Sequence, residues 1–271
     1  MVGRSFVICD IETRVDKSLI QQTRYPHLTE QDAYLRYKQQ LRGESQGRSD
    51  LIPVTYHVPI SIAVGYVDPD YTLRTVETLA YPRDGANGTR PGETPDLFGE
   101  APASAVHGAS GASIERAMVE EFWRLAQDGH TLVTFNGRAF DLPVLELAAL
   151  RYGVQAPKHF NEKYGARFRY SEEGHYDLCD VLSNAGAARL TGGLNALMGM
   201  LGYVGKDGVD GSMVQDLWEQ GKHEIIHAYC RRDVICTYAL FIRLELIHGR
   251  MAREQYAQAC HQSASFLARI R

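Results

Sequence analysis

Apolar runs rich in β-branched and aromatic residues alternate along the chain with longer stretches of helical periodicity. Three of these runs predict strands near residues 4–12, 57–67 and 72–80. A fourth strand is predicted at 130–136, in the sequence HTLVTFN. It follows a predicted helix whose apolar residues recur at three- and four-residue spacing, at Ile114, Met118, Phe122 and Leu125. Strands that alternate with helices in this way predict an α/β fold.

Three segments stand outside this alternation. Residues near 14–50 are polar and helical with little apolar periodicity, which predicts a helical insertion. Residues near 82–112 are rich in Gly, Pro, Ala and Ser, which predicts a flexible surface loop. A helical tail is expected near 250–271. Because 271 residues with 44% hydrophobic content can bury one sizeable core, residues 1–271 are predicted to form a single domain.

Acidic residues in three separated segments carry the candidate chemistry. Asp10 and Glu12 end the first predicted strand, and residues two apart in a strand point to the same side. Asp141 lies where the fourth strand gives way to a helix, with Pro143 in its first turn. Tyr229 and Asp233 are four residues apart in a predicted helix, so they share a face. These side chains can therefore converge at the strand ends, where α/β sheets usually bind ligands.

Carboxylates crowded into one cleft repel each other and take up protons unless a counter-charge is present. Divalent cations supply such a charge. An all-oxygen ligand set suits magnesium or manganese, whereas zinc would call for histidine or thiolate ligands. Two such ions, about 3.5 to 4 Å apart, can stabilise both the attacking and the leaving oxygen of a phosphodiester displacement. The pattern predicts a two-metal nuclease site.

The motifs DIE at 10–12, NGRAFD at 136–141 and YCRRD at 229–233 resemble those of the DEDD 3′-to-5′ exonucleases of the ribonuclease H-like superfamily. The stretch GGLNALMGMLGYVGKDGVDGSMVQDLWEQG also resembles a stand-alone group that is similar to the proofreading domain of family B DNA polymerases. The superfamily divides by whether a histidine five residues before the last aspartate, or a tyrosine four before it, serves the attacking water. Position 228 is Ala and position 229 is Tyr, so the chain resembles the tyrosine class, DEDDy.

The resemblance implies a ribonuclease H-like fold, with a mixed central sheet of about five strands flanked by helices. It also implies that two Mg²⁺ or Mn²⁺ ions and Tyr229 serve catalysis, the metal ligands being Asp10, Glu12, Asp141 and Asp233. The expected reaction releases nucleoside 5′-monophosphates from the 3′ end of single-stranded nucleic acid, DNA being favoured. Two alternatives stay open: an RNA-processing exoribonuclease, and a nucleic-acid-binding module of a repair complex with negligible turnover. Proofreading would require a protein partner in repair or replication, because the motifs include no polymerase.

Asn136 and Phe140 flank Asp141 within the same motif and are candidate substrate-binding residues. An amide there could hold the terminal nucleotide, and an aromatic ring could stack on its base. Phe140 could equally be a core residue. His175, Asp177 and Asp180 form a further polar cluster, which at a helix start predicts capping or solvent contacts rather than catalysis.

The formal charge of −4 argues against tight non-specific binding to nucleic acid, although a local basic patch could still bind phosphates. The segment 14–50 could supply one as a basic lid over the substrate, or it could be an ordinary solvated excursion. The five cysteines lack CxxC spacing, which is typical of buried thiols in a reducing compartment. With no long apolar run either, the protein is expected to be cytoplasmic, with no membrane association.

Overall fold

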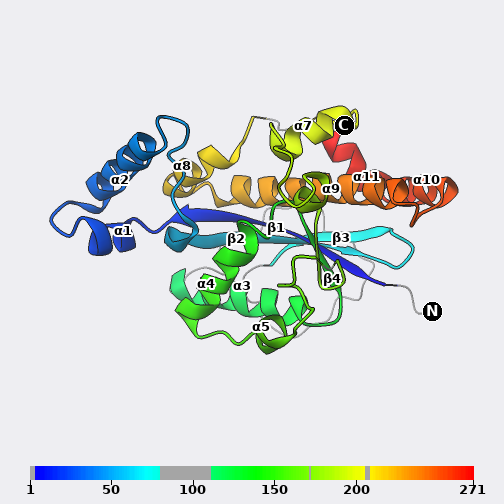
Figure 1. The fold of residues 1–271 in the computed structure, drawn as a ribbon, viewed down its shortest axis with the longest axis horizontal. Coiled ribbons are helices and arrows are strands. Elements are labelled where there is room, and N and C mark those ends of the chain that lie inside the picture. The colour runs from blue at the N-terminus through cyan, green and yellow to red at the C-terminus, as the bar shows by residue number, and fades with distance from the viewer. Residues whose placement is uncertain (1–3, 80–110, 171, 205–207) are drawn as a thin grey trace.

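A five-stranded mixed sheet forms the centre of the molecule (Figure 1). The structure is a computed structural model that describes residues 4–79, 111–170, 172–204 and 208–271. The strands lie in the order β3-β2-β1-β4-β5. The central strand β1 pairs antiparallel with β2 and parallel with β4, which in turn is parallel to β5, while β3 pairs antiparallel with β2. Their bounds are Phe6–Val15 for β1, His57–Val67 for β2, Leu73–Thr78 for β3, Thr131–Thr134 for β4 and His175–Asp177 for β5.

Helices cover both faces of this sheet (Figure 1). One layer contains α3, α4 and α5, with bounds Gly111–Ala126, Asp141–Tyr152 and Pro157–Asn161. The other is built on the long helix α9 (His223–Ile247), with α7 (Gly193–Met200), α8 (Val214–Glu219), α10 (Arg253–Gln262) and α11 (Ala264–Leu267). The short α6 (Leu178–Leu182) follows β5 directly, and three 3₁₀ turns cover Val54–Tyr56, Gly211–Met213 and Ala268–Ile270.

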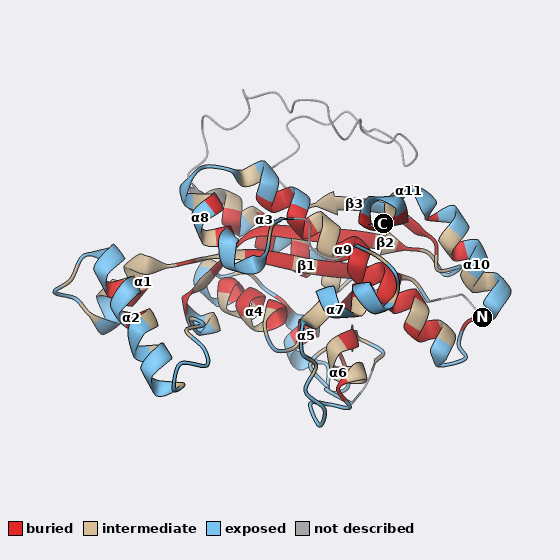
Figure 2. Cartoon of the chain, turned by 90° about the horizontal axis from the view of Figure 1, so that it is seen from above, coloured by how far each residue is buried: buried red, intermediate tan, exposed pale blue. Residues whose placement is uncertain are grey.

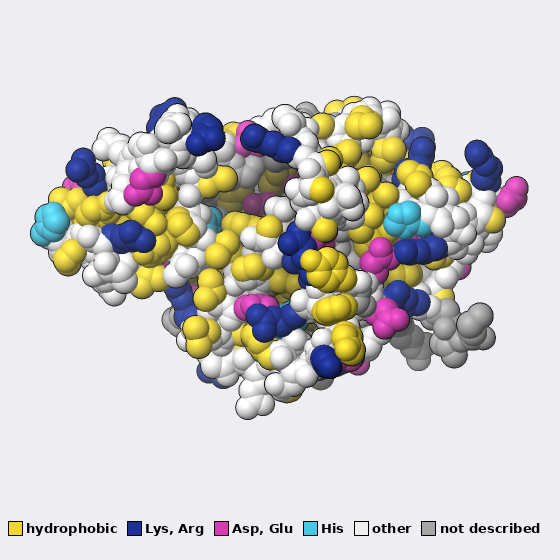
Figure 3. Space-filling view, in the orientation of Figure 1, with side chains coloured by type: hydrophobic (Ala, Val, Ile, Leu, Met, Phe, Trp, Pro, Cys, Tyr) yellow, Lys and Arg dark blue, Asp and Glu magenta, His cyan; other side chains and the backbone are white. Residues whose placement is uncertain are grey.

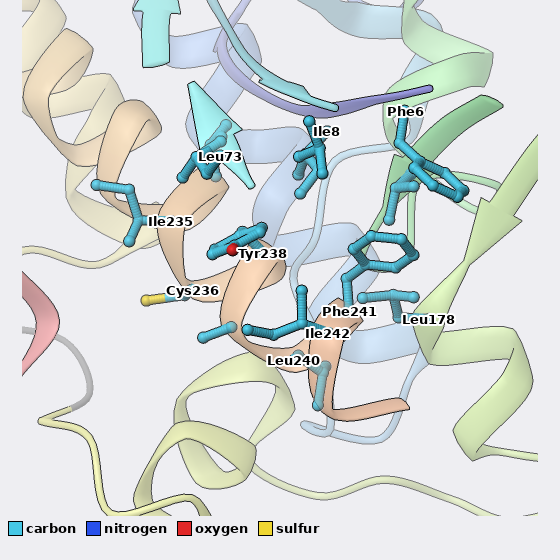
Figure 4. Packing of buried hydrophobic residues seen from close by; sticks show 14 of the residues in the cluster. Phe6, Ile8, Leu73, Leu178, Ile235, Cys236, Tyr238, Leu240, Phe241 and Ile242 are labelled. Carbon is cyan, nitrogen blue, oxygen red and sulfur yellow. The ribbon is translucent and has the colours of Figure 1, made fainter. Parts of the chain in front are cut away.

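The two layers enclose two hydrophobic cores, because successive residues of β1 point to opposite faces of the sheet. Phe6 and Ile8 pack with α9, whereas Val7 and Ile11 pack with α3 and α4. Figure 4 shows the first core, in which Phe241 and Tyr238 of α9 lie beneath the sheet residues. Figure 2 shows the buried residues concentrated in the strands and in α9. Strand β1 is therefore held from both sides, which fixes the direction of the side chains that follow in it.

Helix α9 approaches the sheet closely at one glycine. A Cβ atom on Gly65 of β2 would lie 2.9 Å from Cγ1 of Val234, which is closer than carbon atoms can pack. The absence of a side chain at Gly65 lets α9 lie directly on the strand next to β1. This close contact determines the height of Asp233, the neighbour of Val234, above the sheet.

The segment between β1 and β2 forms a lobe that projects from one end of the molecule (Figure 1). It contains α1 (Lys17–Arg24) and α2 (Glu30–Glu44). Despite the weak apolar periodicity of its sequence, the lobe has a small core of its own, made of Val15, Ile20, Ala33, Tyr37 and Tyr56. The insertion also starts later than residue 14, because β1 continues to Val15.

The predicted fold class is confirmed: an α/β, ribonuclease H-like arrangement with a mixed five-stranded sheet flanked by helices. The strand at 57–67 has the predicted bounds, whereas β5 had no predicted counterpart. Most of the loop predicted near 82–112 falls outside the described residues, and its last two residues open α3. The segment 250–271 contains α10 and α11, and its Met251, Leu267 and Ile270 belong to the main core. Among the described residues, no helix has both the length and the apolar character needed to cross a membrane.

Candidate metal centre

Asp10 and Glu12 lie in the middle of β1, on the side of the sheet that α9 covers. Asp10 is paired with Ala63 and Glu12 with Ser61 of β2, and the register shifts immediately after Glu12. Such a bulge increases the local twist of a strand, and it interrupts the regular pairing next to the acidic pair before pairing resumes at Thr13. The intervening Ile11 points to the opposite core, as alternation requires.

Asp233 joins this pair from α9. One carboxylate oxygen each of Asp10, Glu12 and Asp233 can be chosen so that all three lie within 4.8 Å of one another. Glu12 is buried, and the other two are partly buried. Figure 3 shows a hollow in the region of β1 and α9, with acidic side chains on its floor. Residues that are more than 200 positions apart in the chain therefore form one acidic cluster.

Asp141 approaches the cluster from the first residue of α4. Strand β4 pairs with β1 only from Phe6 to Ile8, so the rest of this edge of β1 has no strand partner in the described sheet. The backbone N–H of Ile11 uses the open edge to donate a hydrogen bond to Oδ1 of Asp141, at 3.2 Å. The early end of β4 thus allows Asp141 to reach the strand that carries Asp10 and Glu12, although it is not one of the three mutually close carboxylates.

The electrostatics of the cluster call for a cation. Burial and the charges of Asp233, Asp141 and Glu12 raise the pKa of Asp10 well above its usual range. Burial also raises the pKa of Asp141 to about 7, to which the charges of Asp177 and Asp233 contribute. Each shift means that the charged form lacks a compensating positive charge. The all-oxygen donor set fits a hard divalent cation such as Mg²⁺ or Mn²⁺.

Tyr229 stands one helical turn before Asp233 on α9, as the spacing predicted. Its ring is 7% exposed and packs with Ile60 of β2 and Leu217 of α8. Burial, together with the charge of Asp233 and a hydrogen bond to it, raises the pKa of the Tyr229 hydroxyl. The phenol is thus held against the acidic cluster and keeps its proton.

Asn136 and Phe140 lie in the segment between β4 and α4. Asn136 is exposed and has a left-handed backbone with φ of 66°, which asparagine tolerates better than most residues. Phe140 is partly buried and packs edge-on against the ring of His57, with centroids 5.2 Å apart. The structure therefore leaves Asn136 exposed, whereas Phe140, the residue before Asp141, is packed and still partly accessible.

Asp177, interpreted from sequence as a capping residue, caps α6 and also holds the Asn136 segment. Its carboxylate accepts hydrogen bonds from the backbone N–H groups of Asn136 and Arg138, at 2.9 and 2.8 Å. It accepts two more from Cys179 and Asp180 at the start of α6. In the same cluster, His175 is buried in β5, where its Nε2 is hydrogen-bonded to Thr134.

The buried thiol of Cys230, next to Tyr229 in the sequence, contacts Asp10. The Cys230 thiol donates to the backbone oxygen of Asp10, at 3.3 Å, and lies 3.6 Å from its carboxylate. Burial and the charges of Asp10 and Glu12 raise the pKa of the thiol well above its usual range. A protonated thiol therefore packs between α9 and β1 and positions Asp10.

We expect Asp177→Ala to lower the free energy of unfolding by about 2 kcal/mol or more, because four backbone N–H groups lose a charged acceptor. Thermal unfolding would measure this as a fall in Tm of about 4 °C or more. Thr29→Ala, which removes a single N-cap contact in α2, is the matched control. Equal effects of the two substitutions would show that Asp177 does not anchor the Asn136 segment.

Comparison with known families agrees with this geometry. The sequence matches, over residues 49–271, the family described as predicted 3′-5′ exonucleases related to the exonuclease domain of PolB. The matched range includes Asp141, Tyr229 and Asp233, whereas Asp10 and Glu12 precede it and join the site through the pairing of β1 with β2. A comparison with curated proteins finds no match. Since the match covers most of the chain, this protein belongs to the family of predicted 3′-5′ exonucleases related to the exonuclease domain of PolB.

Proposed function

We propose that the chain is a metal-dependent enzyme that removes nucleoside 5′-monophosphates from the 3′ end of single-stranded nucleic acid. The observation that carries the proposal is the cluster of Asp10, Glu12 and Asp233, whose oxygens lie within 4.8 Å of one another. Asp141 completes it from the open edge of β1. DNA is the favoured substrate, because the family is related to the exonuclease domain of PolB.

In this proposal the four carboxylates hold two Mg²⁺ or Mn²⁺ ions. Bound ions of this kind lower the pKa of water and stabilise the leaving oxygen of a phosphodiester displacement. Tyr229 orients the attacking water through its hydroxyl, which lies against Asp233. A free phenol has a pKa of about 10, so Tyr229 acts as a hydrogen-bonding group and not as a base at neutral pH.

The experiment that tests the proposal compares end-labelled DNA and RNA single strands of the same sequence. We expect mononucleotides to appear from the 3′ end, and duplex ends to react more slowly because a terminal pair must first be opened, at a cost of a few kcal/mol. Activity should disappear in EDTA and return with Mg²⁺ or Mn²⁺. Full activity in the chelator would refute the metal site, and cleavage of a circular strand would indicate an endonuclease.

The same comparison distinguishes the two other candidate functions. Faster degradation of RNA would identify an exoribonuclease, because contacts to the 2′ hydroxyl allow a protein to distinguish RNA from DNA. Binding of single strands without turnover would identify a binding module of a larger repair complex. All four expected carboxylates and the tyrosine are present, which favours the enzyme. A binding module has no need for a cluster of like charges that repel each other.

Asn136 is proposed to hold the terminal nucleotide with its side-chain amide. An alanine there would also strain the left-handed backbone, so Asn136→Gly is the sharper test because glycine adopts positive φ freely. We expect Asn136→Gly to weaken binding of the 3′ end, measured as a KM several-fold higher, with an unchanged Tm. An unchanged KM would limit Asn136 to a backbone role.

A further inference from the structure

Exposed aromatic side chains gather in one short segment that runs from the end of α5 towards β5. Among the large hydrophobic residues that are exposed in the described part of the chain, every aromatic one lies between positions 160 and 170. They are Phe160 (44% exposed), Tyr164 (59%), Phe168 (36%) and Tyr170 (80%). Large apolar groups clustered on a surface mark an interaction site more often than isolated ones do.

Three of these rings form a row. Tyr164 and Phe168 meet edge to face with centroids 5.2 Å apart, and Phe168 meets Tyr170 in the same manner at 6.0 Å. Edge-to-face contacts leave part of each ring face open, in agreement with the exposed fractions. The segment therefore presents several aromatic faces to the solvent in succession.

Basic side chains alternate with these rings. The Lys163 ammonium group lies 5.2 Å from the centre of the Tyr164 ring, and the Arg167 guanidinium lies 5.1 Å from that of Phe160. Arg167 pairs with Glu146 and Arg169 with Asp180, yet 52% and 47% of these arginine side chains remain exposed. Their positive charges thus stand on the same surface as the rings.

The aromatic segment contacts the part of the chain that leads into Asp141 of the candidate metal centre. Arg138, three residues before Asp141, donates a hydrogen bond to the backbone oxygen of Ala166, at 3.1 Å. Asp180 also pairs with both Arg138, at 3.3 Å, and Arg169, at 3.0 Å. Arg138 thus links the aromatic row to the segment that leads into Asp141. Figure 3 shows hydrophobic and basic side chains gathered beside the acidic hollow, on the same face of the molecule.

We propose that residues 163–170 form a platform for single-stranded nucleic acid, which binds the nucleotides that precede the one in the metal centre. Tyr164, Phe168 and Tyr170 would stack on bases, while Lys163 and Arg169 contact phosphates. Alternating rings and cations are the features by which proteins hold single strands without reading their sequence. Tyrosine, phenylalanine and arginine are also enriched at protein interfaces, so a protein partner is the other outcome that the test distinguishes. The contact of Arg138 with this segment, three residues before Asp141, favours the nucleic acid. This inference rests on the proposed function, because it names the path of the same substrate.

The test measures binding separately from cleavage. A fluorescent 12-nucleotide single strand is titrated in EDTA, where the chain is not expected to hydrolyse it, with wild type and with the double variant Tyr164→Ala/Tyr170→Ala. We expect the double variant to bind at least about tenfold more weakly, because each lost stacking contact weakens binding several-fold or more. Tyr170→Phe should bind like wild type, since it keeps the ring. Leu150→Ala, which removes an equally exposed apolar side chain from α4, is the control.

A second readout separates the platform from a general structural effect. The rate of dinucleotide hydrolysis at saturating substrate should be unchanged in the double variant, because a dinucleotide cannot reach the whole row. Equal binding of the 12-nucleotide strand by wild type and the double variant would overturn the platform and favour a protein partner. The platform would also be overturned if the double variant hydrolysed the dinucleotide more slowly by the same factor by which it bound the 12-nucleotide strand more weakly. Wild-type binding of the strand without cleavage in Mg²⁺ or Mn²⁺ would refute the proposed function alone. No wild-type binding in EDTA would overturn the platform alone, because the proposed function is tested by cleavage with the metal present.

Discussion

Asp141→Asn is expected to reduce turnover by about 10³-fold or more while making the metal-free protein more stable. The substitution removes a proposed metal ligand, and each 1.4 kcal/mol of lost transition-state stabilisation costs a factor of ten in rate. It keeps an oxygen that can accept the hydrogen bond from Ile11, so the local fold should remain. It also removes one negative charge from a cluster in which burial and neighbouring charges oppose ionisation.

The gain in stability should depend on pH. The pKa of Asp141 is raised to about 7 in the folded protein, above its value of about 4 in the unfolded chain. The folded state therefore holds this proton more tightly. Protonated Asp141 therefore contributes to the free energy of unfolding of the metal-free wild type below about pH 4, and this contribution is lost as the pH rises toward 7. In EDTA, the Tm difference between Asp141→Asn and wild type should consequently grow over this range, and added Mg²⁺ should stabilise the wild type more than the variant.

Glu146→Gln is the matched control, because Glu146 lies on the same helix but pairs with His159 and Arg167. This variant should cleave at the wild-type rate and should show no comparable gain in stability in EDTA. Turnover and thermal unfolding in EDTA and in Mg²⁺ would test both expectations. If Asp141→Asn cleaved as fast as wild type, Asp141 would have no place in the site.

Tyr229→Phe is expected to lower the rate of the chemical step by about 10²-fold or more, with metal binding and substrate affinity nearly unchanged. The ring packs against Ile60 and Leu217, and phenylalanine would preserve these contacts. Only the hydroxyl beside Asp233 is lost. An effect of this size is typical of a lost positioning or proton-transfer contact.

Single-turnover rates with saturating substrate would measure the chemical step directly. Tyr238→Phe provides the control, since Tyr238 lies on the same helix and its hydroxyl donates to the backbone oxygen of Tyr71, away from the carboxylates. That variant should lose stability through a buried hydrogen bond and keep its rate. A Tyr229→Phe protein with an unchanged chemical step would show that Tyr229 only packs, and the assignment to the tyrosine class would be wrong.

Local sequence patterns were sufficient for the elements with strong periodicity. The strand at 57–67 and the strand carrying Asp10 are long apolar runs, and such runs report burial directly. Strand β5 was missed because it has only three residues, and its polar His175 and Asp177 are buried through hydrogen bonds with other segments. A pattern of hydrophobic positions cannot reveal a strand that is stabilised by contacts distant in sequence.

Spacing along the chain was enough to predict which of the candidate groups share a face. The two-residue spacing of Asp10 and Glu12 and the four-residue spacing of Tyr229 and Asp233 are local consequences of strand and helix geometry. How the two pairs come together depends on long-range packing. Gly65 sets the height of α9 above the sheet, and the early end of β4 opens the edge of β1 to Asp141.

Tertiary structure alone also revealed the aromatic and basic surface at residues 163–170 and the capping of the Asn136 segment by Asp177. In the sequence, an exposed tyrosine is indistinguishable from a buried one. Exposure, and the nearness of a surface to a site, depend on how elements that are distant in the chain pack together. Those long-range contacts follow from the balance of burial and hydrogen bonding over the whole molecule, which no single segment contains.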